Sequence, residues 1–220
     1  MRVVLASRSA GRADVLAREG VDFVQVDPPY DDPAAAAEGL DGVPAAGSYA
    51  REMAARKLAS CADVLADTLA AAGIGSAPVW VVAADTVCVG VTGRVLGKPA
   101  DATEAAAMLQ GFADAEHAVA TGVALARWDG TAFITPGPRP WFEIAWVTWG
   151  TLDPIDVGRY VASGQWRGKS GGYNLTDRVT DGWPITVNGD QDTVVGLPWR
   201  AIRQVILNAN HAAVTAGARP

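Results

Sequence analysis

The chain has 220 residues, of which 50% are hydrophobic and 19% are charged, so it can bury a sizeable core and is not expected to be disordered. Its net charge of −6, without a long Lys or Arg run, argues against non-specific nucleic-acid binding. The first apolar run, residues 3–6, is too short for a secretory signal, and no stretch approaches the roughly 20 apolar residues of a membrane span. We therefore expect a cytoplasmic protein without stable contacts to nucleic acid or membrane.

Short apolar runs bounded by turn residues predict strands, and apolar residues at helical spacing predict helices. In chain order the prediction is a strand at 2–6, a helix around Val15 and Leu16, a strand at 23–26, an acidic proline-rich loop at 27–33, one long helix at 45–72, a strand at 79–84, a hairpin at 87–96, a helix at 101–109, a strand at 117–126 with a return at 131–134, a strand at 141–149, a helix at 153–163 and a last helix at 199–209. This alternation predicts an α/β fold with a mixed sheet.

Hydroxyls, small residues and an arginine stand where the first strand meets the first helix, in Ala6-Ser7-Arg8-Ser9-Ala10-Gly11-Arg12. The N-terminus of a helix presents free backbone N–H groups and the positive end of the helix dipole, which together favour an anion. Ser7, Ser9 and Arg12 are therefore candidates for binding phosphate. The alternative is that Ser7 or Ser9 is a plain N-cap.

Asp85 and Thr86 follow the buried strand predicted at 79–84, and Lys98 comes one hairpin later in Leu96-Gly97-Lys98-Pro99. The end of a strand in an α/β sheet opens into the crevice where ligands bind, so these three side chains suit a metal ion together with a phosphate. The alternative for an Asp-Thr pair after a strand is a simple turn.

A third cluster is Lys169-Ser170-Gly171-Gly172-Tyr173-Asn174, whose glycines let the backbone approach a ligand and whose lysine adds a charge. A structural turn is the alternative reading of these residues. Neither the P-loop pattern nor the spaced glycine fingerprint of a Rossmann fold is present.

The chain has few soft metal ligands, with two cysteines and two histidines in all. Any metal should therefore be a hard cation held by carboxylates, and Mg²⁺ or Mn²⁺ is the natural candidate. Cys61 and Cys88 lack the spacing of a zinc or redox site, and we expect two buried thiols.

The order and spacing of these clusters resemble the Maf family over nearly the whole chain. The family patterns A-S-x-S-P-R-R, A-x-x-K-A, A-D-T-V-V, L-G-K-P and H-x-V-x-T-G-V-A-L are similar, in that order, to residues 6–12, 54–58, 84–88, 96–99 and 117–125. Further similar segments are 160–164, 169–173 and 195–198. The family's acidic loop ends in D-E, where this chain has Asp31-Asp32.

The resemblance implies one domain over residues 1–220, with a mixed α/β sheet and two intimate lobes flanking a central cleft, as in Maf and inosine triphosphatase-like proteins. It implies an enzyme that hydrolyses nucleoside triphosphates to a monophosphate and pyrophosphate with Mg²⁺ or Mn²⁺. A homodimer is the default expectation, since dimers are the commonest closed assembly. The alternative is a catalytically weak nucleotide-binding protein that regulates septum formation through partners.

The resemblance also implies roles for single residues. Asp85 is the acid assigned to proton acceptance, and Lys57 and Lys98 neutralise phosphate charge. Asp85 is open to a second role as a metal ligand, with Asp32 as the second carboxylate. The substrate-binding residues are Ser7, Ser9, Arg12, Thr86, Lys169 and Thr176.

Three positions depart from the family. Gly11 stands where the family has the first of two arginines, Thr176 where the branch acting on pyrimidine nucleotides has glutamine, and Gln165 where a glutamate is usual. Arg178 is a candidate to compensate for the missing arginine. Trp183 either packs in the core or stacks on a base, and packing is the commoner use of a large aromatic side chain.

Overall fold

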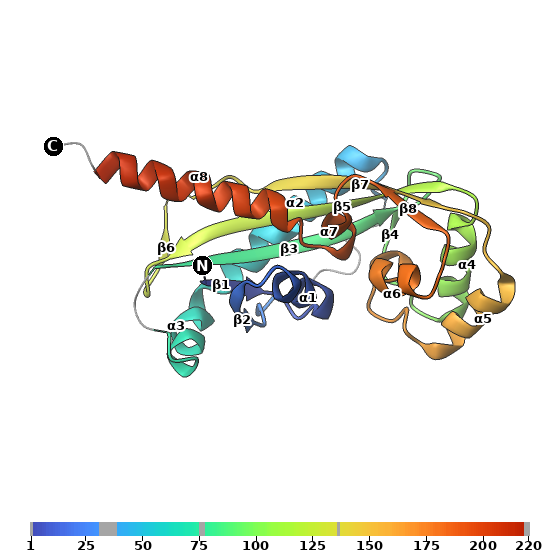
Figure 1. Ribbon diagram of the computed structural model, residues 1–220, viewed down its shortest axis with the longest axis horizontal. Helices are drawn as coiled ribbons and strands as arrows, with labels where there is room; N and C mark the ends of the chain where they lie inside the picture. The colour runs from blue at the N-terminus through green and yellow to red at the C-terminus, as the bar shows by residue number, and fades with distance from the viewer. Residues whose placement is uncertain (1, 31–38, 75–77, 136, 218–220) are drawn as a thin grey trace.

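The computed structural model describes residues 2–30, 39–74, 78–135 and 137–217 (Figure 1). Within them the chain forms an eight-stranded sheet: six strands follow the order β2-β1-β3-β5-β7-β8, and the other two are β4, which pairs with β3, and β6, which pairs with β5. The strands are β1 (Arg2–Ala6), β2 (Asp22–Val26), β3 (Val79–Val89), β4 (Val95–Leu96), β5 (Glu116–Trp128), β6 (Phe133–Ile134), β7 (Trp141–Trp149) and β8 (Ile185–Asn188). Strand β1 is parallel to β2 and β3, whereas the other ladders are antiparallel. The expected mixed α/β fold is confirmed.

The helices pack on both faces of this sheet. They are α1 (Ala10–Arg18), α2 (Val43–Ser60), α3 (Ala62–Ala71), α4 (Ala102–Phe112), α5 (Pro154–Ser163), the short 3-10 helix η2 (Ser170–Gly172), α6 (Leu175–Thr180), α7 (Gln191–Val195) and α8 (Trp199–Gly217). No helix among the described residues is long and apolar enough to cross a membrane.

Side chains of β3 alternate between the two faces and so divide the core. One face packs against α2 and α3, through Val79, Val81 and Ala83. On the other face, Trp80, Val82 and Ala84 pack with α1 and α8 near one end of the strand. Near the other end the same face packs against α4, α5 and the segment around η2, in a separate cluster that includes Cys88.

Helix α2 lies unusually close to the sheet because it crosses β5 at a glycine. A Cβ atom at Gly122 would overlap the backbone of Ala50 in α2. Gly122 is paired with Asp85 of β3, so this close approach brings the following turns of α2 toward the acidic residue.

Two predicted elements differ from the structure. The long helix expected at 45–72 is divided at Cys61 into α2 and α3, a break that the uniform helix propensity of an alanine-rich run does not reveal. The strand expected to end at Ala84 continues to Val89, so Asp85 and Thr86 lie inside β3 rather than after it. The sequence analysis also did not predict α6, β8 and α7, which are 6, 4 and 5 residues long.

The segment around η2 is tied to β5 by a buried aromatic cluster. Within it, His117 Nε2 and the Tyr173 hydroxyl are 2.8 Å apart, and the imidazole stacks on Phe112 with ring centroids 3.9 Å apart. Trp183 packs here too, with its ring 5.4 Å from that of Trp149, so it is a core residue and not an exposed stacking surface. Burial lowers the pKa of His117 from 6.5 to about 4.

The contact at Gly122 predicts a large loss of stability when a methyl group is added. Gly122→Ala should lower the free energy of unfolding by about 3 kcal/mol or more, because α2 must move away from the sheet. Gly158→Ala is the matched control, since it lies in α5 and the added Cβ would meet no atom within 4 Å outside the backbone of its own helix. It should gain roughly 0.5–1 kcal/mol. Urea unfolding checks both, and equal stabilities would contradict the packing of α2.

His117 predicts a specific pH dependence of stability. The unfolded chain takes up a proton near pH 6.5 and the folded chain only near pH 4, so stability falls as the pH decreases between these values. The loss is up to about 3 kcal/mol. We expect His117→Gln to lose less stability than the parent between pH 7.5 and pH 4, by up to that amount. Equal losses in the variant and the parent would refute the assignment.

Candidate active site

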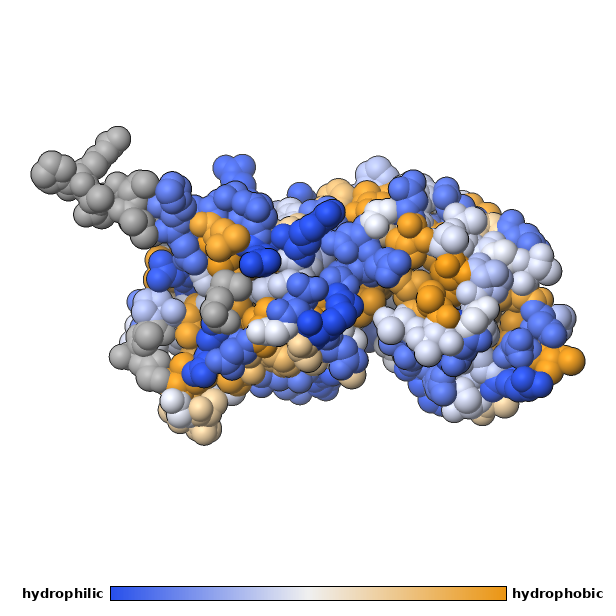
Figure 2. Space-filling model, viewed as in Figure 1, coloured by the Kyte–Doolittle hydropathy of each residue, from blue (hydrophilic) through white to orange (hydrophobic). Residues whose placement is uncertain are grey.

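Five of the predicted site residues gather along one edge of β3, between two shorter neighbouring strands: Ser7, Arg12, Lys57, Asp85 and Thr86. Strand β1 pairs with residues 80–83, and β4 pairs with residues 88–89. In the described part of the chain, this edge has no strand partner at residues 84–87, a length of about 13 Å. Asp85 and Thr86 lie in this interval. Figure 2 shows the surface hollowed between the two ends of the molecule.

Asp85 points to the face that α2 covers, where it forms an ion pair with Lys57. The Lys57 Nζ atom is 2.5 Å from Asp85 Oδ1, and each side chain is only 12% exposed. Two turns of α2 separate Lys57 from Ala50, the residue that sits on Gly122. The close approach of α2 therefore places an ammonium group directly on the acid.

Thr86 points to the opposite face, where it meets the first helix. The guanidinium of Arg12 donates from Nη2 to the Thr86 hydroxyl at 3.1 Å and from Nη1 to Ser7 Oγ at 2.9 Å. Its Nε donates to the carbonyl of Gly196 at 2.8 Å. Three acceptors, two of them distant in the sequence, thus fix Arg12 beside the open edge.

The hydrogen bonds of Ser7 leave its own proton free to serve a ligand. Ser7 Oγ accepts from Arg12 Nη1 and from the backbone N–H of Ser9, which uses both lone pairs. Among the described residues no acceptor is recorded for the Ser7 hydroxyl proton, which suits a phosphate oxygen. Ser9 is the N-cap of α1 and accepts from the Arg12 backbone N–H, so the N-cap reading holds for Ser9.

Thr121 and Gly196 belong to this cluster although no role was predicted for them. Thr121 Oγ1 lies 3.0 Å from Thr86 Oγ1 and donates to the carbonyl of Thr193 at 2.7 Å. Both residues lie in segments that carry the family resemblance, 117–125 and 195–198. That placement was the only sequence signal, because neither residue type is diagnostic of a site.

Three other predicted residues, Lys98, Lys169 and Thr176, form no hydrogen bond with Asp85 among the described residues. Lys98 is exposed in the loop after β4, and Thr176 is exposed in the first turn of α6. Lys169 donates to the carbonyl of Gln165, and burial lowers the pKa of its ammonium group. Asp32, the predicted second metal ligand, lies outside the described residues. The loops of Lys98 and Lys169 adjoin, since Gly171 N donates to Gly97 O at 3.1 Å.

Arg178 is committed to the interior and is not placed to replace the arginine that is missing at Gly11. It is 4% exposed, and its guanidinium carbon lies 4.0 Å from the centre of the Tyr160 ring. Its Nη2 donates to Gln165 Oε1 at 2.9 Å and pairs with Asp181 at 2.8 Å. The glutamine at position 165, where a glutamate is usual in the family, therefore accepts a hydrogen bond from this buried arginine.

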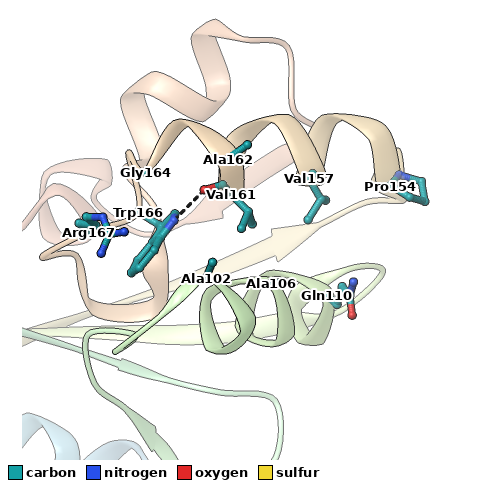
Figure 3. Close-up of a pocket in the computed structure, with 11 residues that line it drawn as sticks. Ala102, Ala106, Gln110, Pro154, Val157, Val161, Ala162, Gly164, Trp166 and Arg167 are labelled. Carbon is teal, nitrogen blue, oxygen red and sulfur yellow. Dashed lines mark hydrogen bonds between the residues drawn. The ribbon is translucent and has the colours of Figure 1, made fainter.

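Two grooves lie away from the Lys57–Asp85 pair. One, of about 410 Å³, runs between α4 and α5 and is lined by mostly apolar residues such as Val157 and Trp166 (Figure 3). The other, of about 440 Å³, lies between β7 and the start of α8. None of the predicted site residues that the structure describes lines either groove.

Comparisons with known proteins identify the family of this chain. The family model described as Maf-like protein matches residues 2–209. The chain belongs to the Maf family.

Similar Maf relatives are named dTTP/UTP pyrophosphatases. They include one from Ralstonia nicotianae, 33% identical over 88% of this chain and 87% of its own, and one from Rhizobium meliloti, 33% identical over 90% and 87%. A third, from Pelotomaculum thermopropionicum, is 36% identical over 89% and 90%.

Maf pyrophosphatases generally depend on a divalent metal ion, and the donor set here is compatible with one. The described residues contain no group of three His, Cys, Asp or Glu side chains that could hold a metal by themselves. Mg²⁺, however, is commonly held by one or two carboxylates together with substrate phosphates and water. The Asp85 carboxylate at the open edge meets that requirement.

The Lys57–Asp85 pair predicts a measurable coupling energy. Asp85→Asn and Lys57→Met should each destabilise the fold, because each removes one member of an enclosed ion pair, and the double variant should recover about 1–2 kcal/mol of the summed loss. The control is the exposed pair of Arg56 and Glu52 on the same helix. Arg56→Met should cost at most about 0.5 kcal/mol. Additive losses at Lys57 and Asp85 in urea unfolding would mean that the pair is not formed.

Proposed function

We propose that this Maf-family protein is a nucleoside triphosphate pyrophosphatase that hydrolyses the bond between the α and β phosphates. The observation that carries the proposal is the arrangement at the open edge of β3. An acid–lysine pair stands on one face and an arginine held by three acceptors on the other. The names of the similar relatives, which match over most of this chain, support the same activity.

The chemistry follows from the charges at this edge. Arg12 and the Ser7 hydroxyl would bind phosphate oxygens, and Lys57 and Lys98 would neutralise further phosphate charge. A phosphate that draws the Lys57 ammonium toward itself also releases Asp85 Oδ1 to accept a proton from water. The water oxygen then bonds to phosphorus, the bridging P–O bond breaks, and pyrophosphate leaves.

A bound Mg²⁺ or Mn²⁺ ion would supply positive charge that offsets the charge developing on the phosphates. Asp85 would hold it together with Asp32. Asp85 therefore has two alternative roles, proton acceptor or metal ligand, and both need its carboxylate at the open edge.

Pyrimidine nucleotides are the first substrates to test, because the similar relatives are named for dTTP and UTP. Gly11 and Thr176 depart from the pyrimidine branch, so we expect the preference among bases to be broader than in that branch. We expect the protein to act in the cytoplasm, where its two buried thiols, Cys61 and Cys88, stay reduced. A homodimer is the expected assembly.

Asp85→Asn should lower turnover by at least about 100-fold, because proton acceptance or metal charge is lost while the side chain keeps its shape. The measurement is pyrophosphate release from a panel of nucleoside triphosphates that includes dTTP and UTP, with Mg²⁺ or Mn²⁺. Asp67→Asn, an exposed change on α3, is the control and should act like the parent.

Two results would contradict this proposal. Near-normal turnover by Asp85→Asn would remove the role of Asp85. A folded parent protein that releases no pyrophosphate from any triphosphate would remove the activity itself and favour the regulatory alternative.

A further inference from the structure

Three hydrogen bonds link Arg12 to α7 through the hydroxyl groups of Thr86 and Thr121, which are paired residues on neighbouring strands. The donor and the acceptor of each bond follow from the chemistry of the groups. A threonine hydroxyl has one proton to donate. Thr121 gives its proton to the carbonyl of Thr193, at 2.7 Å, because a carbonyl oxygen can only accept. In the 3.0 Å contact between Thr121 and Thr86, Thr86 must therefore be the donor.

This direction fixes what the Thr86 oxygen can do toward Arg12. With its proton committed to Thr121, Thr86 Oγ1 faces Arg12 Nη2 as an acceptor at 3.1 Å. The series thus runs one way, from the Arg12 guanidinium through Thr86 and Thr121 to the carbonyl of Thr193. Thr121 is fully buried and lies between β3 and α7, so it cannot touch a substrate.

The turn between α7 and α8 closes around the same atoms. Gly196 has φ +106, and a Cβ there would lie 2.7 Å from Thr86 Oγ1 and 3.2 Å from Arg12 Nε. A glycine is required for the chain to pass so close in this conformation. The carbonyl of Gly196 then accepts from Arg12 Nε at 2.8 Å. Helix α7 and its following turn therefore support Arg12 both directly and through Thr121.

We propose that Thr121 is a positioning residue for Arg12. By taking the single proton of Thr86, it keeps the Thr86 oxygen as an acceptor and so holds the guanidinium at the open edge of β3. The part of this inference that concerns phosphate rests on the proposed function. The part that concerns the guanidinium does not, because it is a property of the protein without ligand.

Removing the Thr121 hydroxyl releases the Thr86 proton. That proton can then turn toward Arg12, where it meets an N–H donor, and one anchor of the guanidinium is lost. Thr121→Ser keeps the hydroxyl and should keep the series. The matched control is Thr68→Val, which removes a hydroxyl that donates to a backbone carbonyl in α3 at 2.8 Å, away from the site.

The first measurement is made by NMR on ligand-free protein. It is the rate at which the two Nη groups of Arg12 exchange by rotation about the Nε–Cζ bond, with the signal assigned by its loss in Arg12→Lys. Thr121→Val should raise this rate up to about tenfold, as expected for losing one hydrogen bond. Thr121→Ser and Thr68→Val should keep the parent rate. An unchanged rate in Thr121→Val, or a raised rate in Thr121→Ser, would overturn the proposal.

The second measurement is the KM for UTP. Thr121→Val should raise KM about tenfold and change kcat by less than about threefold, because Lys57 and Asp85 lie on the other face. In a Thr86→Val background it should raise KM no further, since Thr121 acts through Thr86. An equal rise in both backgrounds would show a merely structural effect and overturn the proposal.

The two measurements separate this inference from the proposed function. If the parent protein releases no pyrophosphate, the proposed function fails, and the exchange rate of Arg12 still decides the role of Thr121. If Thr121→Val does not fold, Thr121→Ala removes the same hydroxyl without adding a methyl group and takes its place in both measurements.

Discussion

Consecutive side chains of a strand point to opposite faces of a sheet, so Asp85 and Thr86 can serve one ligand only where the edge of their strand is open. Strand β1 stops pairing at Ala83, and β4 starts pairing at Cys88. The interval between them lets groups from both faces reach one place. Lys57 comes from the helix on one side, and Arg12 comes from the helix on the other. A fully paired β3 would separate these groups by the thickness of the sheet.

The helices pack on both faces of the sheet in a way that leaves this interval of β3 open. The face that carries Thr86 holds two separate apolar clusters, one with α1 and α8 and one with α4 and α5. Polar residues, Thr86 and Thr121, fill the space between the two clusters. Helix α2 crosses the opposite face, and its close contact with Gly122 brings Lys57 to Asp85. The same glycine therefore serves both the stability of the fold and the geometry of the site.

The sequence was sufficient to predict most strands, because β1, β5 and β7 are apolar runs whose ends carry turn residues. Through the order of its motifs it also pointed to Asp85, Lys57, Ser7 and Arg12 as candidates, but not to the ion pair that Lys57 and Asp85 form. It could not show that β3 continues past Ala84, since an acid and a hydroxyl inside a buried strand look like its end. It could not reveal the role of Thr121, because a threonine on a strand is common. That role depends on the carbonyl of Thr193, which is 72 residues away in the sequence.

The departure at Gly11 is best understood from what occupies its surroundings. A Cβ there would lie 3.2 Å from Val195 Cγ1, so α7 packs against the first turn of α1 where the family has a longer side chain. The change removes a positive charge from the first turn of α1 but leaves Arg12, the second arginine position, with three acceptors. One of these acceptors is the carbonyl of Gly196, which directly follows Val195. Because the segment that fills the space at Gly11 also anchors Arg12, the loss of one guanidinium leaves the other firmly placed, which favours an active enzyme over a scaffold.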